Sequence, residues 1–341
     1  MQDDYVRLMQ RLAPDLAQQI EKRALVLERI AALQPVGRRL LAARLNLPER
    51  EVRSVAALLK EHGMISMDGS GMVLTAEAEK VLSSARRFSR ENRGLTEMER
   101  EISSRLGIEK TFIIAGDFDQ EMHVLQEVAK VAATQLRALL QSGFTLAVTG
   151  GQTIHEVAVS IAHGSAMNVM VVPARGAMGS FLETQANAVA SEIARRLGGH
   201  HRLIHLPDDL DEQALAEMKK LREVAEALEL LQRADVVMHG IGRADEMVQR
   251  RRLPVAIKEE VLQKGAVAEA YGCYFDLEGR VVFAASSVAH DIGILKPSCS
   301  WVAVAAGSGK AQAITGVMKS RPHAVLVTDE GAAREVLKLI S

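Results

Sequence analysis

Four glycine-rich segments in the C-terminal part of the chain have the composition of anion-binding loops. They are Thr149-Gly150-Gly151-Gln152-Thr153, Pro173-Ala174-Arg175-Gly176, His239-Gly240-Ile241-Gly242 and Ala306-Gly307-Ser308-Gly309-Lys310. A glycine loop ahead of a helix lets backbone N–H groups approach an anion, and the helix dipole favours negative charge there. Arg175, Arg250 and Lys310 add cations. Together the segments predict a site for a phosphorylated ligand, although each one alone could simply be a tight turn.

The sequence fingerprints of nucleotide-binding loops are incomplete. Lys310 is followed by Ala311, where a P-loop has Ser or Thr, and Asp245 stands where a dinucleotide fingerprint has Gly. We therefore expect a sugar phosphate rather than ATP or NAD, and no cofactor.

Other reactive residues give weaker indications of chemistry. Asp117 and Asp119 follow a predicted strand, but the residues after them do not match those of aspartyl phosphatases. His200, His201 and His205 do not share a helix face, so we expect no metal site.

A sugar-phosphate isomerase or deaminase remains the alternative function. It would need a general acid/base pair, for which Glu269 and His239 are the candidates, although His239 could equally be a core or loop histidine.

The glycine segments follow apolar, β-branched stretches that alternate with helical ones. The predicted strands are residues 111–115, 145–149, 168–172, 201–206, 235–239, 301–305 and 324–328. This alternation predicts an α/β fold, a Rossmann-like doubly wound parallel sheet with helices on both faces. Ligands bind outside the carboxyl ends of the strands in such folds, which is where the glycine segments lie.

The N-terminal part of the chain predicts a winged helix-turn-helix. A helix beginning at Pro14 ends before Pro35, and a short helix over 37–45 and a longer one over 49–62 are separated by a break at 46–48. Residues 64–75 then read as a hairpin around Asp68-Gly69-Ser70-Gly71.

The longer helix has the chemistry of a DNA reader. Glu49, Arg50, Arg53 and Ser54 lie on its leading turns, and Arg38 and Arg39 open the preceding helix. We expect these six residues to contact double-stranded DNA. The alternatives are a solvated basic face and a winged helix that binds protein.

Charge separates the two parts of the chain. The net charge is −1, yet residues 1–90 hold 15 Lys and Arg against 11 Asp and Glu, a net of +4. A polar, basic stretch over 83–93 precedes Thr96 and Glu99, which have the spacing of a capping box and predict a helix beginning at Thr96. We therefore expect domains over 1–92 and 93–341.

No uninterrupted run of about 18 apolar residues occurs, so we expect a cytoplasmic protein without a membrane partner.

Six long motifs, together with the winged helix, resemble the SorC family of sugar-responsive bacterial repressors. They are VTGGQTIHEVA, VPARGAMG, HGIGRADEMVQRR, AVAEAYGCYF, AAGSGKAQAI and VLVTDEGAA. The resemblance implies a homo-oligomeric repressor of glycolytic genes, dimer or tetramer, with a C-terminal domain like sugar-phosphate isomerases and deaminases. It also implies fructose 1,6-bisphosphate as the effector that modulates operator binding.

The same resemblance implies an effector site. Its residues are Gly150, Gly151, Gln152 and Thr153 as a phosphate loop, Arg175 with Gly176, Arg250 and Lys310 as the source of positive charge, Glu269 as acceptor for sugar hydroxyls, and Gln185 and Asn187 as weaker candidates. Two positions depart from the family pattern: Gln152 replaces a hydroxyl residue, and Ala306 replaces Gly. The amide of Gln152 can still donate hydrogen bonds to a phosphate.

Overall fold

The structure, a computed structural model, describes residues 2–164, 167–175, 182–206, 212–251, 253–284, 295 and 298–341. The chain forms two compact units, Met1–Thr96 and Glu97–Ser341. The division predicted near residue 92 falls at the C-terminal end of the last helix of the first unit, α5 (Ala76–Asn92).

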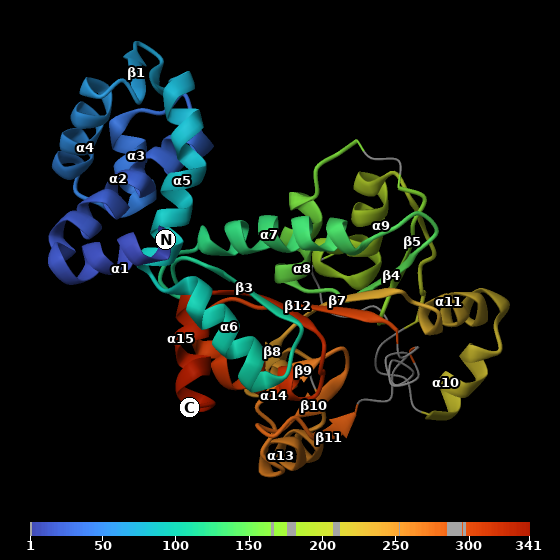
Figure 1. Cartoon of the computed structure of the whole chain (residues 1–341). Helices are drawn as coiled ribbons and strands as arrows, with labels where there is room; N and C mark the ends of the chain where they lie inside the picture. The colour runs from blue at the N-terminus through green and yellow to red at the C-terminus, as the bar shows by residue number, and fades with distance from the viewer. Residues whose placement is uncertain are drawn as a thin grey trace. The chain divides into compact units, whose positions relative to one another are not determined.

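The first unit is a winged helix (Figure 1). Before α5 it contains α1 (Gln2–Leu12), α2 (Pro14–Leu33), α3 (Arg38–Leu45), α4 (Glu49–Glu61), β1 (Ile65–Asp68) and β2 (Gly71–Leu74). The predicted helix-turn-helix and hairpin are confirmed, and α1 is an addition to them. Asn46 ends α3 in the left-handed conformation, and α4 follows Pro48. Val52 and Leu59 of α4 pack with Ile30 and Leu41 in one apolar core.

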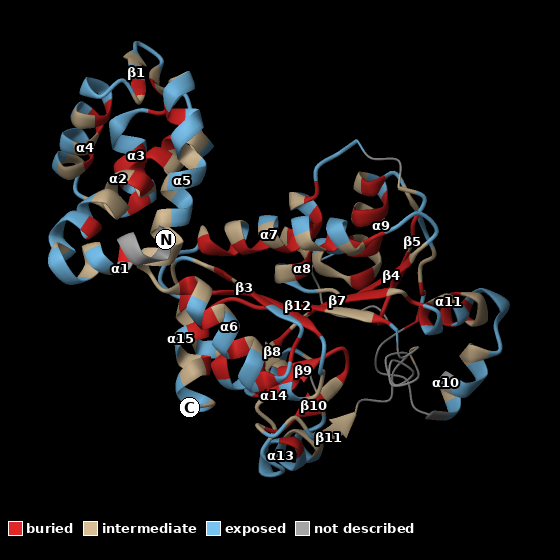
Figure 2. Cartoon of the chain, viewed as in Figure 1, coloured by how far each residue is buried: buried red, intermediate tan, exposed pale blue. Residues whose placement is uncertain are grey.

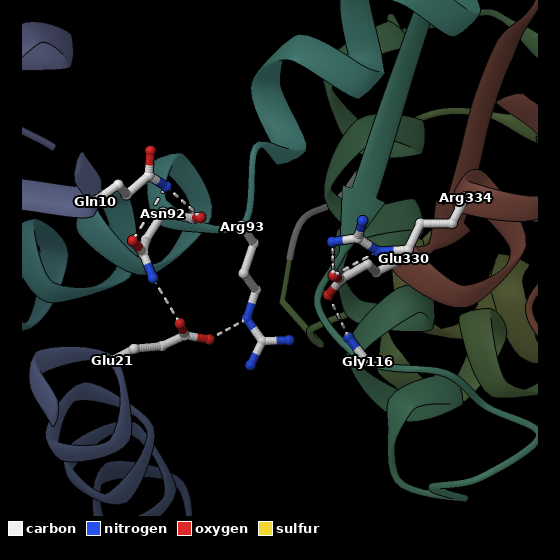
Figure 3. Close-up of polar contacts among 7 residues, drawn as sticks. All are labelled: Gln10, Glu21, Asn92, Arg93, Gly116, Glu330 and Arg334. Atoms are coloured by element: carbon white, nitrogen blue, oxygen red, sulfur yellow. Dashed lines mark hydrogen bonds and ion pairs between the residues drawn. The ribbon is translucent and has the colours of Figure 1, made fainter. Parts of the chain in front are cut away.

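The C-terminal end of α5 is fastened to α1 and α2 by polar contacts (Figure 3). Asn92 Nδ2 donates to Glu21 Oε2 at 2.7 Å, and Gln10 Nε2 donates to the Asn92 carbonyl oxygen at 2.7 Å. Arg93 Nε lies 2.5 Å from Glu21 Oε1. The last residues of α5 are therefore held as part of the winged helix.

The second unit is built on a seven-stranded sheet of order β3-β13-β12-β7-β4-β5-β6, with every pairing parallel. The strands are β3 (Lys110–Ile114), β4 (Thr145–Val148), β5 (Met170–Pro173), β6 (His200–His201), β7 (Val236–Gly240), β12 (Ser300–Val304) and β13 (Val325–Asp329). All seven predicted strands are present, although β6 is much shorter than the predicted 201–206. Figure 2 shows that the strands form the most buried layer of this unit.

Helices cover both faces of this sheet, as predicted. In Figure 1, α7 (Val124–Leu139), α8 (Gln152–Ser160) and α9 (Ala186–Leu197) lie on one side, and α6 (Leu95–Leu106), α14 (Ala311–Lys319) and α15 (Glu330–Leu339) lie on the other. The remaining helices are α10 (Glu212–Lys219), α11 (Arg222–Gln232), α12 (Ala244–Arg250) and α13 (Val255–Gln263), with short 3-10 turns η1 (Leu182–Thr184) and η3 (Ser308–Lys310).

The topology changes direction between β4 and β7. From β4 the chain continues to β5 and β6 on one side, whereas from β7 it continues to β12 and β13 on the other. The exits of these two adjacent strands therefore form the topological switch point, where ligands bind in open α/β sheets.

Two details differ from the sequence prediction. A second, antiparallel sheet joins β8 (Gly242–Arg243), β9 (Ala268–Ala270), β10 (Cys273–Phe275) and β11 (Val281–Ala284). Helix α6 begins at Leu95, so Thr96 lies inside the helix and not at the N-cap position that the predicted capping box gives it. Glu99 Oε1 accepts a hydrogen bond from the Ile113 backbone N–H at 2.7 Å.

The turn between β1 and β2 contains Gly69 and Gly71, and it requires glycine at position 71. Gly71 has φ +136°, and a Cβ there would lie 2.8 Å from the backbone nitrogen of Val36, whose chain bridges to Met72. We expect Gly71→Ala to destabilise the winged helix by about 2 kcal/mol or more, because strain and a backbone clash add. Gly69→Ala is the matched control, since nothing lies within 4 Å of its Cβ position. Urea denaturation followed by circular dichroism checks both variants, and equal midpoints would contradict this account of the turn.

Candidate functional site

The first glycine loop connects β4 to α8 at the switch point. A Cβ on Gly150 would lie 2.5 Å from the Thr184 carbonyl oxygen, and Gly151 has φ +109° while its N–H donates to the same oxygen at 2.7 Å. Both positions therefore require glycine. The N-cap residue of α8 is Gly151, which has no side chain to cap the helix. The first-turn N–H groups of a helix have no intrahelical acceptor, so this end of α8 suits an anion.

Gln152 and Thr153 begin α8 next to that loop. Gln152 is exposed, and within the part of the chain that the structure describes its amide makes only a 3.4 Å contact, with Glu156 Oε1. Thr153 is half-buried. The structure thus brings Gly150, Gly151, Gln152 and Thr153 together at one helix end.

A buried charge cluster lies beyond the exits of β5 and β7. Glu269 is 4% exposed, and its Oε1 accepts from Arg175 Nη1 at 3.0 Å and from the Gly272 N–H at 2.8 Å. Arg251 Nη2 lies 2.6 Å from the same oxygen. Burial raises the pKa of Glu269 above its ordinary value, while Arg175 and the Gly272 N–H oppose that rise. The small antiparallel sheet positions this carboxylate, because β9 pairs Glu269 with Gly242 immediately after β7.

Arg251 is the cation in this cluster that was absent from the predicted set. The predicted Arg250 is exposed, whereas the Arg251 side chain is 6% exposed. Helix α12 ends at Arg250, so the two neighbours point in different directions. The sequence shows that two arginines, Arg250 and Arg251, are adjacent, but not which of them is buried. The end of α12 at Arg250 decides that.

Lys310 lies at the exit of β12. Its side chain forms no hydrogen bond or ion pair with any residue that the structure describes. Burial lowers the pKa of Lys310 below its ordinary value, and the charge of Arg250 acts in the same direction against that of Glu246. An anion bound here would favour the charged form of the amine.

The N–H groups of the Gly307–Lys310 loop already donate to carboxylates. Asp329 Oδ2 accepts from Gly307 at 2.8 Å, Asp117 Oδ1 accepts from Ser308 at 3.1 Å, and Asp119 Oδ2 accepts from Gly309 at 2.8 Å. This loop is therefore a formed anion cradle whose acceptors come from the protein.

The structure describes two of the three remaining predicted ligand residues, Asn187 and Gln185. Asn187 Nδ2 donates to the Ile204 carbonyl oxygen at 2.9 Å, and its Oδ1 accepts from the Ile204 N–H at 3.2 Å. Its amide therefore supports the chain after β6. Gln185 is half-buried at the N-cap position of α9. Gly176 lies outside the described residues.

His239, the acid/base candidate of the alternative enzyme, is enclosed by aromatic rings. Its side chain is fully buried, with ring centres 5.1 Å from Tyr271 and 5.8 Å from Trp301. Burial lowers the pKa of His239 to about 4, so the ring is neutral at pH 7. Its Nδ1 contacts the Gly240 carbonyl oxygen at 3.1 Å. This environment is that of a packed core histidine.

A cavity of about 490 Å³ lies beside the β12 exit, lined by Arg243, Asp245, Ser308, Gly309 and Gln312 among others. None of the predicted ligand residues that the structure describes is in its lining. We therefore place the candidate ligand site at the sheet edge, which this cavity adjoins at Ser308 and Gly309.

The predicted DNA-contacting residues lie on the surface of α3 and α4. Arg38, Arg39, Arg50, Arg53 and Ser54 are exposed. Glu49 Oε1 lies 3.2 Å from Arg53 Nη2, and Glu49 Oε2 lies 3.9 Å from Arg39 Nε. Glu49 therefore sits between two arginines, where it can orient them.

Known proteins match both units. Residues 90–338 match the family described as "Putative sugar-binding domain", and residues 20–88 match "CggR N-terminal DNA binding domain". The chain is 35% identical over 335 residues to the central glycolytic genes regulator of Priestia megaterium, covering 98% of each chain. It is 34% identical over 334 residues to the protein of that name from Bacillus subtilis, again covering 98% of each.

Solved structures agree with this assignment. A "putative SorC family transcriptional regulator" from Enterococcus faecalis is 34% identical, with a TM-score of 0.66, over 71% of this chain and 99% of that one. The chain belongs to the SorC family of transcriptional regulators. The full-length sorbitol operon regulator SorC from Klebsiella pneumoniae shares the fold at 15% identity, with a TM-score of 0.62 over 96% of this chain and 100% of that one. This SorC-family chain thus combines a DNA-binding and a sugar-binding domain.

Among the helices that the structure describes in this SorC-family chain, none combines the length and the apolar composition needed to cross a bilayer.

Asp329 anchors the edge of the sheet in this SorC-family chain. It is fully buried, caps α15 through the Ala332 N–H at 3.0 Å, and also accepts from Phe118 at 2.7 Å and from Gly307. Burial raises the pKa of Asp329 above its ordinary value, and the three N–H donors oppose that rise.

We expect Asp329→Ala to destabilise the second unit by about 3 kcal/mol or more, because several buried N–H groups lose their acceptor. Asp245→Ala is the comparison, since Asp245 is an exposed carboxylate of the same unit that accepts from the Glu246 backbone N–H at 3.0 Å. Chemical denaturation checks the order. Equal losses in the two variants would contradict the anchoring role of Asp329.

Proposed function

We propose that this chain represses genes of central glycolysis and that fructose 1,6-bisphosphate weakens its hold on operator DNA. The observation that carries the proposal is the pair of glycine loops after β4 and β12, which flank the exit of β7. One loop opens a helix without a side-chain cap, and the other ends in Lys310. The names of the relatives from Priestia megaterium and Bacillus subtilis support the link to glycolytic genes.

The spacing of the two loops suits a ligand with two phosphates. Adjacent strands lie about 4.8 Å apart, so exits that are two strand positions apart lie roughly 10 Å from each other. A hexose with a phosphate at each end spans a comparable distance. Between the loops, the buried cluster offers Glu269. Its Oε1 is occupied by Arg175, Arg251 and Gly272, whereas no described residue donates to Oε2, which is the oxygen that can accept a sugar hydroxyl.

The winged helix supplies the DNA contacts in this proposal. Arg50 and Arg53 on the leading turns of α4 would read base edges in the major groove, and Arg38 and Arg39 would hold phosphates. In a homo-oligomer, two such units contact half-sites separated by whole helical turns. The effector acts by favouring a state that binds the operator less well.

Replacing Arg53 tests the DNA contact. We expect Arg53→Ala to weaken operator binding by about 5-fold or more, because one good base contact contributes about 1–3 kcal/mol. Arg87→Ala is the matched control, because Arg87 is also exposed and paired to a glutamate one helical turn away. Fluorescence anisotropy with labelled operator measures both affinities. Operator affinity retained in Arg53→Ala would remove α4 from the reading role.

Replacing Lys310 tests the ligand contact. We expect Lys310→Ala to weaken fructose 1,6-bisphosphate binding by about 10-fold or more while operator affinity stays unchanged, because a charge-assisted contact is lost. Wild-type ligand affinity should also fall as alkaline pH deprotonates Lys310, below the pH at which an ordinary lysine would lose its charge. This part of the pH dependence should disappear in the variant.

Lys264→Ala is the control for general charge effects, because Lys264 is exposed on the surface after α13 and pairs with Glu260. Titration calorimetry gives the affinities. NMR of the ligand after incubation separates sensor from enzyme, since conversion of the sugar phosphate would support the isomerase or deaminase alternative. Unchanged ligand affinity in Lys310→Ala would exclude this lysine from the site.

A further inference from the structure

The Asp119 carboxylate occupies a site with the chemistry of a phosphate pocket. Its Oδ2 accepts from the Gly309 N–H at 2.8 Å and from Ser308 Oγ at 3.3 Å. A backbone N–H and a hydroxyl at a glycine loop are donors that phosphates use. The Asp119 charge also acts on two cations nearby, Lys310 and Arg243.

Glycine at position 307 admits this carboxylate. A Cβ there would lie 2.5 Å from Asp119 Oδ1, and the residue has φ +105°. The loop that would hold one phosphate of the ligand is thus shaped around a carboxylate of the same chain.

We infer that Asp119 fills one of the two phosphate positions in the ligand-free protein, and that a bisphosphate must displace it to bind. The inference rests on the proposed function, and it names a residue that sets ligand selectivity at that site. Asp119 comes from the loop between β3 and α7, far in sequence from the loop it fills.

The other two carboxylates at this loop are built in more firmly. Asp329 is fully buried and holds three N–H groups. Asp117 is half-buried, accepts from Ser308 and from the Asp119 N–H, and lies where a Cβ on Gly331 would come within 2.3 Å. Asp119 is exposed, and the hydrogen bonds of its side chain in the described structure go only to the Gly307–Lys310 loop. It can therefore leave without dismantling the edge of the sheet.

Displacement by phosphate is chemically selective. A phosphate brings more acceptor oxygens and more negative charge than a carboxylate, so it can replace Asp119 on the same donors and cations. A neutral sugar hydroxyl cannot replace that charge. The fraction of molecules with Asp119 in place lowers the apparent affinity for any ligand that needs this position.

Removing the carboxylate should therefore strengthen ligand binding. We expect Asp119→Ala to lower the dissociation constant for fructose 1,6-bisphosphate by at least about fivefold, because the position becomes vacant. In titration calorimetry at fixed ionic strength, this gain should disappear when Lys310→Ala is added, since both residues then act on the same phosphate.

Glu121→Ala is the matched control. Glu121 is an exposed acid of the same loop, and its ion pair is with His123 at 3.6 Å rather than with the Gly307–Lys310 loop. Its removal should change ligand affinity by no more than about twofold, as exposed charges contribute little. If thermal denaturation shows that Asp119→Ala folds poorly, Asp119→Asn takes its place as the test. It keeps the side-chain size and should also strengthen ligand binding.

The outcomes separate this inference from the proposed function. Failure of the wild-type chain to bind fructose 1,6-bisphosphate would reject the proposed effector. Inorganic phosphate would then be the probe. If Asp119→Ala binds phosphate more tightly than both the wild type and Glu121→Ala do, the inference that Asp119 occupies a phosphate position is still supported. Wild-type binding with equal or weaker binding by the Asp119 variants would overturn the inference, as would an equal gain in Glu121→Ala.

Discussion

The backbone N–H groups at the carboxyl edge of the parallel sheet need acceptors, and the structure of the second unit depends on where those acceptors come from. Every strand ends at this edge, and the first turn of each following helix leaves N–H groups without an intrahelical partner. At the exit of β12, Asp117, Asp119 and Asp329 supply the acceptors. At the exit of β4, the N-cap residue of α8 is Gly151, which has no side chain to act as acceptor. One edge therefore carries both a filled and an open anion site.

The sequence predicts the parts of this arrangement that depend on local pattern. Apolar runs locate all seven strands, and the break at residues 46–48 locates the helix-turn-helix. The antiparallel sheet escapes prediction because β9 and β10 have three residues each, too few to show alternation. The burial of Arg251 beside Glu269 could not be predicted, because the end of α12 decides which of the two adjacent arginines is buried. The role of Asp119 escapes because its partner Gly309 lies 190 residues away.

The buried cluster of Glu269 with Arg175 and Arg251 explains why the candidate ligand residues are fixed rather than free. Withdrawing charges from water is costly unless each is paired, and removing one partner leaves an uncompensated charge. Two guanidinium groups and the Gly272 N–H share a single carboxylate oxygen. The second oxygen keeps its direction as a result. A rigid acceptor between two anion sites loses little freedom when a sugar binds, which favours affinity.

The chain after Arg93 connects the winged helix to the sugar-binding unit. The contacts of Glu21 and Asn92 hold the end of α5 within the winged helix (Figure 3), so that unit extends as one body to this point. Gly94, with φ +69°, follows immediately, and α6 begins at Leu95. A left-handed residue between two helices is a place where the chain direction can change at little cost. Linkage requires reciprocity, so if the sugar weakens operator binding by some factor, operator DNA must weaken sugar binding by that same factor.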